Sequence, residues 1–285
     1  MRNLCDVKTM KVLLEEAGFH FSKAKGQNFL TADWVPQRIA EEAGADEGTA
    51  VLEIGPGFGA LTQQLCLRAA KVLAVEVDNS LRPVLKKTVG EFDNLEILYA
   101  DALQLDLAAL VRDRFSGLRP IACANLPYYI TSPVLTKLLE SKAFSSVTVM
   151  VQKEVAQRIC AAPGTADYSA FTVFCQYHAV PEILFDVPPS CFLPQPKVTS
   201  AVLTLKTRTA PPCEIADEAL FFRVVRAAFA QRRKTLPNAL ASGFPELTKD
   251  ALTELIVSCG HKPTVRGETL SIPQFAALAN RLAAR

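Results

Sequence analysis

An amide, a backbone carbonyl and an aromatic ring stand together in Asn125-Leu126-Pro127-Tyr128. The Asn125 side-chain oxygen and the Leu126 carbonyl can each accept an N–H from an exocyclic amine, which turns the amine lone pair out of conjugation and aligns it for attack. Pro127 stiffens the turn, and the Tyr128 ring can stack on a flat base. A neutral Asn suffices as acceptor, because a newly methylated nitrogen is cationic and loses its proton easily. The tetrapeptide indicates methyl transfer to the amino group of a base.

A glycine-rich turn lies seventy residues upstream, where Gly55 and Gly57 follow an apolar segment. Glycine lets the backbone approach a ligand closely. Glu76 follows about twenty residues later, the spacing at which an acid binds a ribose diol, and the Asp101 carboxylate can accept a hydrogen bond from an adenine amino group. No Lys or Arg stands near the turn to bind a phosphate. We therefore predict S-adenosylmethionine, which has a ribose and an adenine but no phosphate.

Each motif has a purely structural alternative. A glycine turn can be a plain tight turn, Glu76 and Asp101 can be caps or solvated strand ends, and the tetrapeptide can join a strand to a helix. The order in which the motifs follow one another favours the functional interpretation.

The elements around these motifs alternate between short apolar strands and amphipathic helices, which is typical of a parallel sheet covered on both faces. We expect strands over 51–54, 72–77, 95–100, 120–124 and 147–151, followed by 182–186 and 200–205, which could form a hairpin. We expect helices over 7–20, 33–43, 61–69, 80–89, 107–114, 132–140, 152–160, 170–178, 218–233, 248–258 and 272–284. The prediction is an α/β domain over 23–207, with a helical extension over 1–22 and a small all-α domain over 208–285.

Composition excludes several classes of protein. The 285 residues are 49% hydrophobic with a net charge of +2, so composition alone does not indicate a nucleic-acid binder. The eight cysteines are scattered singly and the three histidines stand apart from them, which argues against a metal site or disulfides and for a reducing, cytoplasmic setting. We expect neither a signal peptide nor a membrane helix.

The chain resembles the small-subunit ribosomal RNA adenine dimethyltransferase family over nearly its whole length. The matching motifs are Lys25–Leu30, Glu53–Gly59, Val75–Asp78, Asp101-Ala102, Asn125–Pro133, Val151–Ala156 and Phe192–Ala201. The resemblance implies a Rossmann-like, seven-stranded class I methyltransferase domain with a C-terminal helical domain. It implies cofactor contacts at Asn28, Leu30, Gly55, Gly57, Glu76, Asp101 and Asn125. It also implies that Phe192 closes on the target base opposite Tyr128.

The same resemblance implies N6-dimethylation of two adjacent adenosines in a hairpin loop near the 3′ end of small-subunit (16S) rRNA. It further implies a monomer that acts on a pre-mature small ribosomal subunit, a link to late subunit assembly and an effect on kasugamycin sensitivity. A base must leave its stack to be methylated, and aromatic faces replace the lost stacking.

A basic stretch without an acidic residue runs from Ala219 to Pro245. We predict that it binds rRNA phosphates together with Lys23 and Lys25, although a solvated helix face would have the same composition. Its cationic residues are Arg223, Arg226, Arg232, Arg233 and Lys234.

Three alternatives stay open. Erythromycin-resistance methyltransferases, which act on large-subunit rRNA, typically have Ile in place of Leu126 and a smaller C-terminal region. DNA adenine methyltransferases usually carry Asp in place of Asn125. A non-catalytic assembly or transcription factor could keep the fold, but the intact Asn125, Tyr128 and Glu76 argue against lost chemistry.

Overall fold

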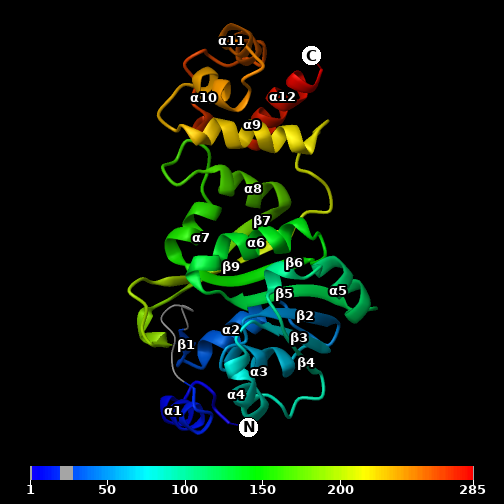
Figure 1. Cartoon of the computed structure of the whole chain (residues 1–285), viewed down its shortest axis with the longest axis vertical. Helices are drawn as coiled ribbons and strands as arrows, with labels where there is room; N and C mark the ends of the chain where they lie inside the picture. Colours follow the sequence, from blue (N-terminus) through cyan, green and yellow to red (C-terminus); the bar gives the residue numbers. More distant parts are fainter. Residues whose placement is uncertain (1, 20–27, 285) are drawn as a thin grey trace. The chain divides into compact units, whose positions relative to one another are not determined.

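The computed structural model describes residues 2–19 and 28–284, and the chain divides into two compact units (Figure 1). The first unit comprises Met1–Ala156 and Pro181–Thr207, and the second comprises Gln157–Val180 and Arg208–Arg285. The segment Gln157–Val180 thus belongs with the last helices, whereas the sequence placed it in the methyltransferase domain. As limits of independently folding domains, 1–22, 23–207 and 208–285 stay a prediction.

A mixed sheet forms the centre of the first unit. Within the described residues seven strands pair in the order β4-β3-β2-β5-β6-β9-β7, and a separate two-stranded sheet joins β1 to β8. The strands are β1 (Phe29–Leu30), β2 (Thr49–Ile54), β3 (Lys71–Glu76), β4 (Leu95–Tyr99), β5 (Arg119–Asn125), β6 (Ser146–Gln152), β7 (Ala179–Val187), β8 (Phe192–Leu193) and β9 (Ser200–Thr207).

The middle strands are parallel and β9 is antiparallel to β6. Every residue of β2 is buried, as expected for a strand with helices on both of its faces. The sequence therefore predicted the parallel part of the sheet. The two late strands expected over 182–186 and 200–205 lie side by side as β7 and β9, but the antiparallel pairing of β9 with β6 is a feature that short apolar runs do not specify.

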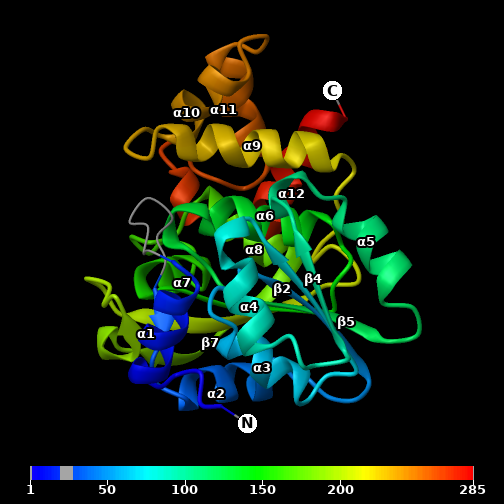
Figure 2. The same cartoon turned by 60° about the horizontal axis from the view of Figure 1, so that its bottom comes forward.

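Helices cover the two faces of the sheet. In the sheet, β3 and β4 lie on one side of β2, while β5 and β6 lie on the other. Because crossovers between parallel strands are right-handed, the helices that follow β2 and β3 lie on one face of the sheet and the helix that follows β5 lies on the opposite face. Figures 1 and 2 accordingly show α3 and α4 on one side of the strands and α6 on the other. The helices of this unit are α1 (Val7–Glu16), α2 (Trp34–Glu42), α3 (Ala60–Cys66), α4 (Arg82–Thr88), α5 (Leu107–Arg114) and α6 (Thr131–Glu140), and α7 (Lys153–Ile159) begins in it.

The second unit is helical and has its own core. Apolar side chains of α8, α9 and the last helices form one buried cluster that includes Tyr168, Val173, Phe221, Leu255 and Phe275. Its helices are α8 (Ala170–His178), α9 (Glu218–Ala230), α10 (Leu236–Gly243), α11 (Lys249–Ser258) and α12 (Ile272–Ala283). The sequence predicted α8, α11 and α12 closely, extended α9 to residue 233 and missed α10.

Candidate functional site

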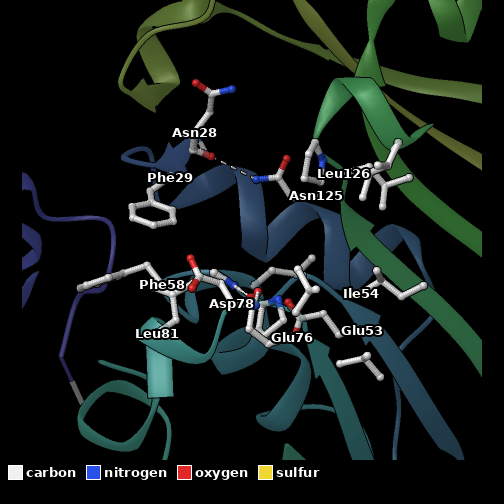
Figure 3. A pocket seen from close by; sticks show the side chains of 18 of the residues that line it. Asn28, Phe29, Glu53, Ile54, Phe58, Glu76, Asp78, Leu81, Asn125 and Leu126 are labelled. Carbon is white, nitrogen blue, oxygen red and sulfur yellow. Dashed lines mark hydrogen bonds between the residues drawn. The ribbon is translucent and has the colours of Figure 1, made fainter. Parts of the chain in front are cut away.

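A pocket of about 340 Å³ opens at the carboxyl ends of β2, β3 and β5, where the strand order reverses (Figure 3). This switch point is the usual ligand site of an open α/β sheet. The pairing of Ile54 with Ala124 places the turns that follow β2 and β5 side by side. The β1–β8 pair supplies another wall, since Leu30 lies opposite Phe192 in that ladder and both line the pocket.

The glycine turn forms the floor of the pocket. Gly55 and Gly57 have φ values of 72° and 57°, a left-handed conformation that favours glycine. A Cβ on Gly55 would meet no atom within 4 Å, whereas a Cβ on Gly57 would lie 3.2 Å from Phe29 Cε1. Gly55 therefore keeps its side of the pocket open to a ligand, and Gly57 lets the turn pack against β1.

The carboxylate of Glu76 holds this turn in place. Its Oε2 accepts a hydrogen bond from the Gly57 N–H at 3.2 Å, and its Oε1 accepts one from the Asp78 N–H at 2.8 Å. Burial raises the pKa of Glu76, although these backbone hydrogen bonds act to lower it. Each carboxylate oxygen has a second lone pair, so Glu76 can still accept hydrogen bonds from the hydroxyls of a ribose.

A second carboxyl, that of Glu53, also lines the pocket. Glu53 is 1% exposed, and its Oε2 has no hydrogen-bond partner within the described part of the chain. Burial raises its pKa to about 8, with Thr62 acting to lower it and the Glu76 carboxylate to raise it. Burial thus favours the protonated, neutral form of the Glu53 carboxyl.

Asn125 ends β5 and presents its amide to the pocket. Its Nδ2 donates to the Asn28 carbonyl oxygen at 3.4 Å, the dashed line in Figure 3, which leaves Oδ1 as an acceptor. The following Leu126 is buried, and its N–H donates to the Met150 carbonyl of β6 at 3.2 Å. The amide and the Leu126 backbone are thus held by the sheet and by the segment before β1, which suits them to bind an amino group in one orientation.

Two predicted aromatic residues line the same pocket. Tyr128 begins a short turn after Pro127, and its hydroxyl lies 2.8 Å from Ser200 Oγ. Burial raises the pKa of Tyr128, so the phenol stays protonated at neutral pH. Phe192 is 3% exposed and belongs to the core as well as to the pocket wall.

The structure brings most of the predicted cofactor residues together and leaves one apart. Asn28, Leu30, Gly55, Gly57, Glu76 and Asn125 line the pocket. Asp101 is not among the lining residues, although its neighbours Ala100 and Ala102 are. Its Oδ1 accepts a hydrogen bond from the Leu103 N–H at 2.9 Å. Its hydrogen bond to adenine stays a prediction.

The predicted RNA-binding cations fall into two groups. Arg223 donates to Glu246 at 2.8 Å and stacks on Phe244, and Arg232 donates to the Ala166 carbonyl at 2.7 Å and lies 3.6 Å from Glu268. The described residues offer no ion pair to the exposed side chains of Arg226, Arg233 and Lys234. Glu246, which directly follows the basic stretch, and the more distant Glu268 thus pair with two of the five cations. Lys23 and Lys25 lie outside the described residues.

The pocket also contains residues to which the sequence assigned no role. Phe29, Phe58 and Leu81 add apolar surface, and Asp78 adds a second acid beside Glu76. Tyr129 is 63% exposed at the pocket. Phe58 and Asp78 stand inside the quoted motifs, so the motifs could have indicated them; Leu81 lies outside every motif.

Two further observations concern possible metal ligands and membrane helices. In the described part of the chain no cluster of three or more His, Cys, Asp or Glu residues is arranged to hold a metal ion. No helix in that part has both the length and the apolar character needed to cross a membrane.

Comparison with known proteins gives a family model described as ribosomal RNA adenine dimethylase, which matches residues 18–283. A ribosomal RNA small subunit methyltransferase A from Alkaliphilus oremlandii is 44% identical over 284 residues, which cover 99% of each chain. Another protein of that name, from Geobacillus kaustophilus, is 45% identical over 96% of this chain and 94% of its own.

Solved structures of similar fold include a 23S rRNA methyltransferase, with a TM-score of 0.67 and 26% identity over 90% of this chain and all of its own. They also include a dimethyladenosine transferase from Plasmodium falciparum, with a TM-score of 0.72 and 24% identity over 88% of this chain and 95% of its own. The second likeness bears on the fold alone.

Proposed function

Since the chain belongs to the ribosomal RNA adenine dimethylase family, we propose that its pocket binds S-adenosylmethionine and presents an rRNA adenine to it. The chain is an rRNA (adenine-N6,N6)-dimethyltransferase of the small subunit. We propose that its target is two adjacent adenosines in a hairpin loop near the 3′ end of that rRNA. The observation that carries the proposal is that Gly55, Glu76 and Asn125, each at the end of a different strand, line one cavity.

The residues present fit the cofactor. The Gly55 side of the turn is open to a ligand, and Glu76 has lone pairs left for a ribose. Apolar side chains of Phe29, Leu81 and Ala102 line the rest of the cavity, which suits an adenine ring. When bound there, S-adenosylmethionine supplies a methyl group attached to a positively charged sulfur.

The residues after β5 orient the target amine. We propose that Asn125 Oδ1 and the Leu126 carbonyl accept its two N–H groups, so that its lone pair leaves the ring π-system. Tyr128 and Phe192 hold the base between them. A neutral amide does not take up a proton at neutral pH, so the proton that the amine loses passes to water.

Asn125→Ala tests this arrangement. We expect kcat on unmethylated small subunits to fall by about 100-fold or more, because one of the two acceptors is lost, while S-adenosylmethionine binding measured by calorimetry stays within a few fold. Turnover at the wild-type rate in this variant would remove Asn125 from the mechanism.

Substrate choice is tested by incubating the protein and labelled cofactor with unmethylated small subunits, large subunits and DNA. We expect label only in small-subunit rRNA, and label only in large-subunit rRNA would overturn the assignment. We further propose that the substrate is a pre-mature small subunit, that the protein acts as a monomer in the cytoplasm and that methylation is coupled to late assembly. The preference for a pre-mature subunit and the coupling to late assembly are tested by comparing assembly intermediates with finished subunits as substrates.

A further inference from the structure

Two hydroxyl groups meet behind the base pocket, and the chemistry proposed above uses only one of the residues that carry them. Tyr128 lies in the turn after β5 and lines the pocket, while Ser200 begins β9 and is 0% exposed. The Tyr128 hydroxyl and Ser200 Oγ are 2.8 Å apart, a normal O–H···O hydrogen bond. Ser200 itself does not line the pocket, so Tyr128 connects its hydroxyl with the space that a base would occupy.

Ser200 is held by the sheet. In the antiparallel ladder of β6 and β9 it lies opposite Gln152, and Val202 lies opposite Met150. The Met150 carbonyl accepts the Leu126 N–H, so the turn that carries Tyr128 is attached to β6 through its backbone and to β9 through the tyrosine hydroxyl. The first attachment holds the chain between Asn125 and Tyr128, and the second holds the hydroxyl end of the Tyr128 side chain.

The turn has little else to hold the ring. Tyr128, Tyr129 and Ile130 form one short turn of 3-10 helix without a side-chain cap, and none of the three is buried. A ring on such a turn can take several orientations unless a specific contact selects one, and stacking on a base requires one.

We propose that Ser200 is a positioning residue for methyl transfer, because its hydroxyl fixes the plane of the Tyr128 ring on which the target adenine stacks. The proposal rests on the proposed function, since it assumes that Tyr128 contacts the base. A protonated phenol at the buried end of the ring is consistent with this, because the hydroxyl then acts as a hydrogen-bonding anchor and not as a base.

A double-mutant cycle with Ser200→Ala and Tyr128→Phe tests the proposal. Both changes break the same hydrogen bond, so we expect each to lower kcat on small subunits by about threefold to tenfold and the double variant to be no worse than either. The dissociation constant for S-adenosylmethionine, measured by calorimetry, is expected to stay within twofold. Tyr128→Phe changes the partly buried partner, so it probes the bond even if Ser200→Ala folds poorly.

A matched control lies on the same strand. The Thr148 and Thr204 hydroxyls, both buried between β6 and β9, form a hydrogen bond of 3.2 Å, and neither residue lines the pocket. Thr204→Val removes this bond with little change in volume. We expect it to lower stability without changing kcat, which separates a general loosening of β9 from an effect on Tyr128.

A second measurement does not depend on turnover. In an rRNA hairpin with 2-aminopurine at one target position, stacking on Tyr128 quenches fluorescence, and we expect weaker quenching with Ser200→Ala than with wild type. Additive effects of the two substitutions on kcat, or equal quenching, would overturn the positioning role. Wild-type protein that binds no S-adenosylmethionine, or methylates no small subunit, would instead overturn the proposed function itself.

Discussion

The carboxyl of Glu53 makes the stability of this protein depend on pH. Its pKa in the folded chain is about 8, above the ordinary value of 4.5. Between these values the folded chain holds a proton that the unfolded chain has released, so stability is greatest below pH 4.5 and falls as pH rises through 8.

Glu53→Gln removes this titration and keeps the shape of the protonated acid. We expect the variant to gain stability relative to wild type between pH 5 and pH 8, by as much as about 4 kcal/mol, as measured by urea unfolding at each pH. The exposed Glu91→Gln provides the control. Parallel stability curves for wild type and Glu53→Gln would show that Glu53 ionises normally.

Several predicted site residues stand where an apolar strand of the sheet ends. Gly55, Glu76 and Asn125 stand at such positions, and all three line the pocket. Glu53 and Ser200 lie within buried strands, where a polar residue gives no indication of which side chain it will meet. The contact of Ser200 with Tyr128 depends on the pairing of β9 with β6, which local patterns do not specify.

Helices α9 and α10 approach closely because Gly243 has no side chain. A Cβ built on Gly243 would overlap the Ala227 Cβ of α9. We expect Gly243→Ala to destabilise the protein by about 1–3 kcal/mol, since overpacking forces the two helices apart. Chemical unfolding measures the effect, and Ser242→Ala, at a neighbouring exposed position of α10, is the control. Equal stability of Gly243→Ala and wild type would mean that the helices can separate at no cost.

The elements that the sequence missed have specific causes. α10 begins Leu236-Pro237, and a proline inside an apolar run resembles a helix break although it is favourable in a first helical turn. The expected end of α9 at 233 was wrong because Gln231 leaves the helical conformation, with φ of −136°. β1 and β8 have two residues each, too few to show a period, and only their pairing defines them.

The charge of the whole molecule is nearly balanced, so binding to rRNA depends on where its cations lie. We expect the double variant Arg233→Ala/Lys234→Ala to weaken rRNA binding and to reduce the slope of log affinity against log salt by about 1.5, because two phosphate contacts are lost. Binding titrations at several salt concentrations measure this. Arg223→Ala is the control, since Glu246 already binds that guanidinium, and we expect it to leave the slope unchanged. An unchanged slope in the double variant would leave these two cations as part of a solvated surface.

The sequence predicted only part of the division of the chain into two units. The limit expected between residues 207 and 208 falls at the same place as one boundary of the contact-defined units. Gln157–Val180 belongs to the second unit because its apolar side chains pack there with residues that are distant in sequence. Tyr168, Val173 and Tyr177 share one buried cluster with Phe221 and Phe275. Helical periodicity predicts such faces but not their partners.

Because Gln157–Val180 packs with the last helices, its apolar residues lack their partners during part of protein synthesis. Val173 and Tyr177 leave the ribosome before the strand β9 that completes the sheet, and well before Phe221 and Phe275, with which they share a core. Until α9 and α12 have been made, the apolar face of α8 has none of these partners and is open to aggregation or to a chaperone. If the central sheet assembles as soon as β9 has been made, it does so while α8 is still exposed.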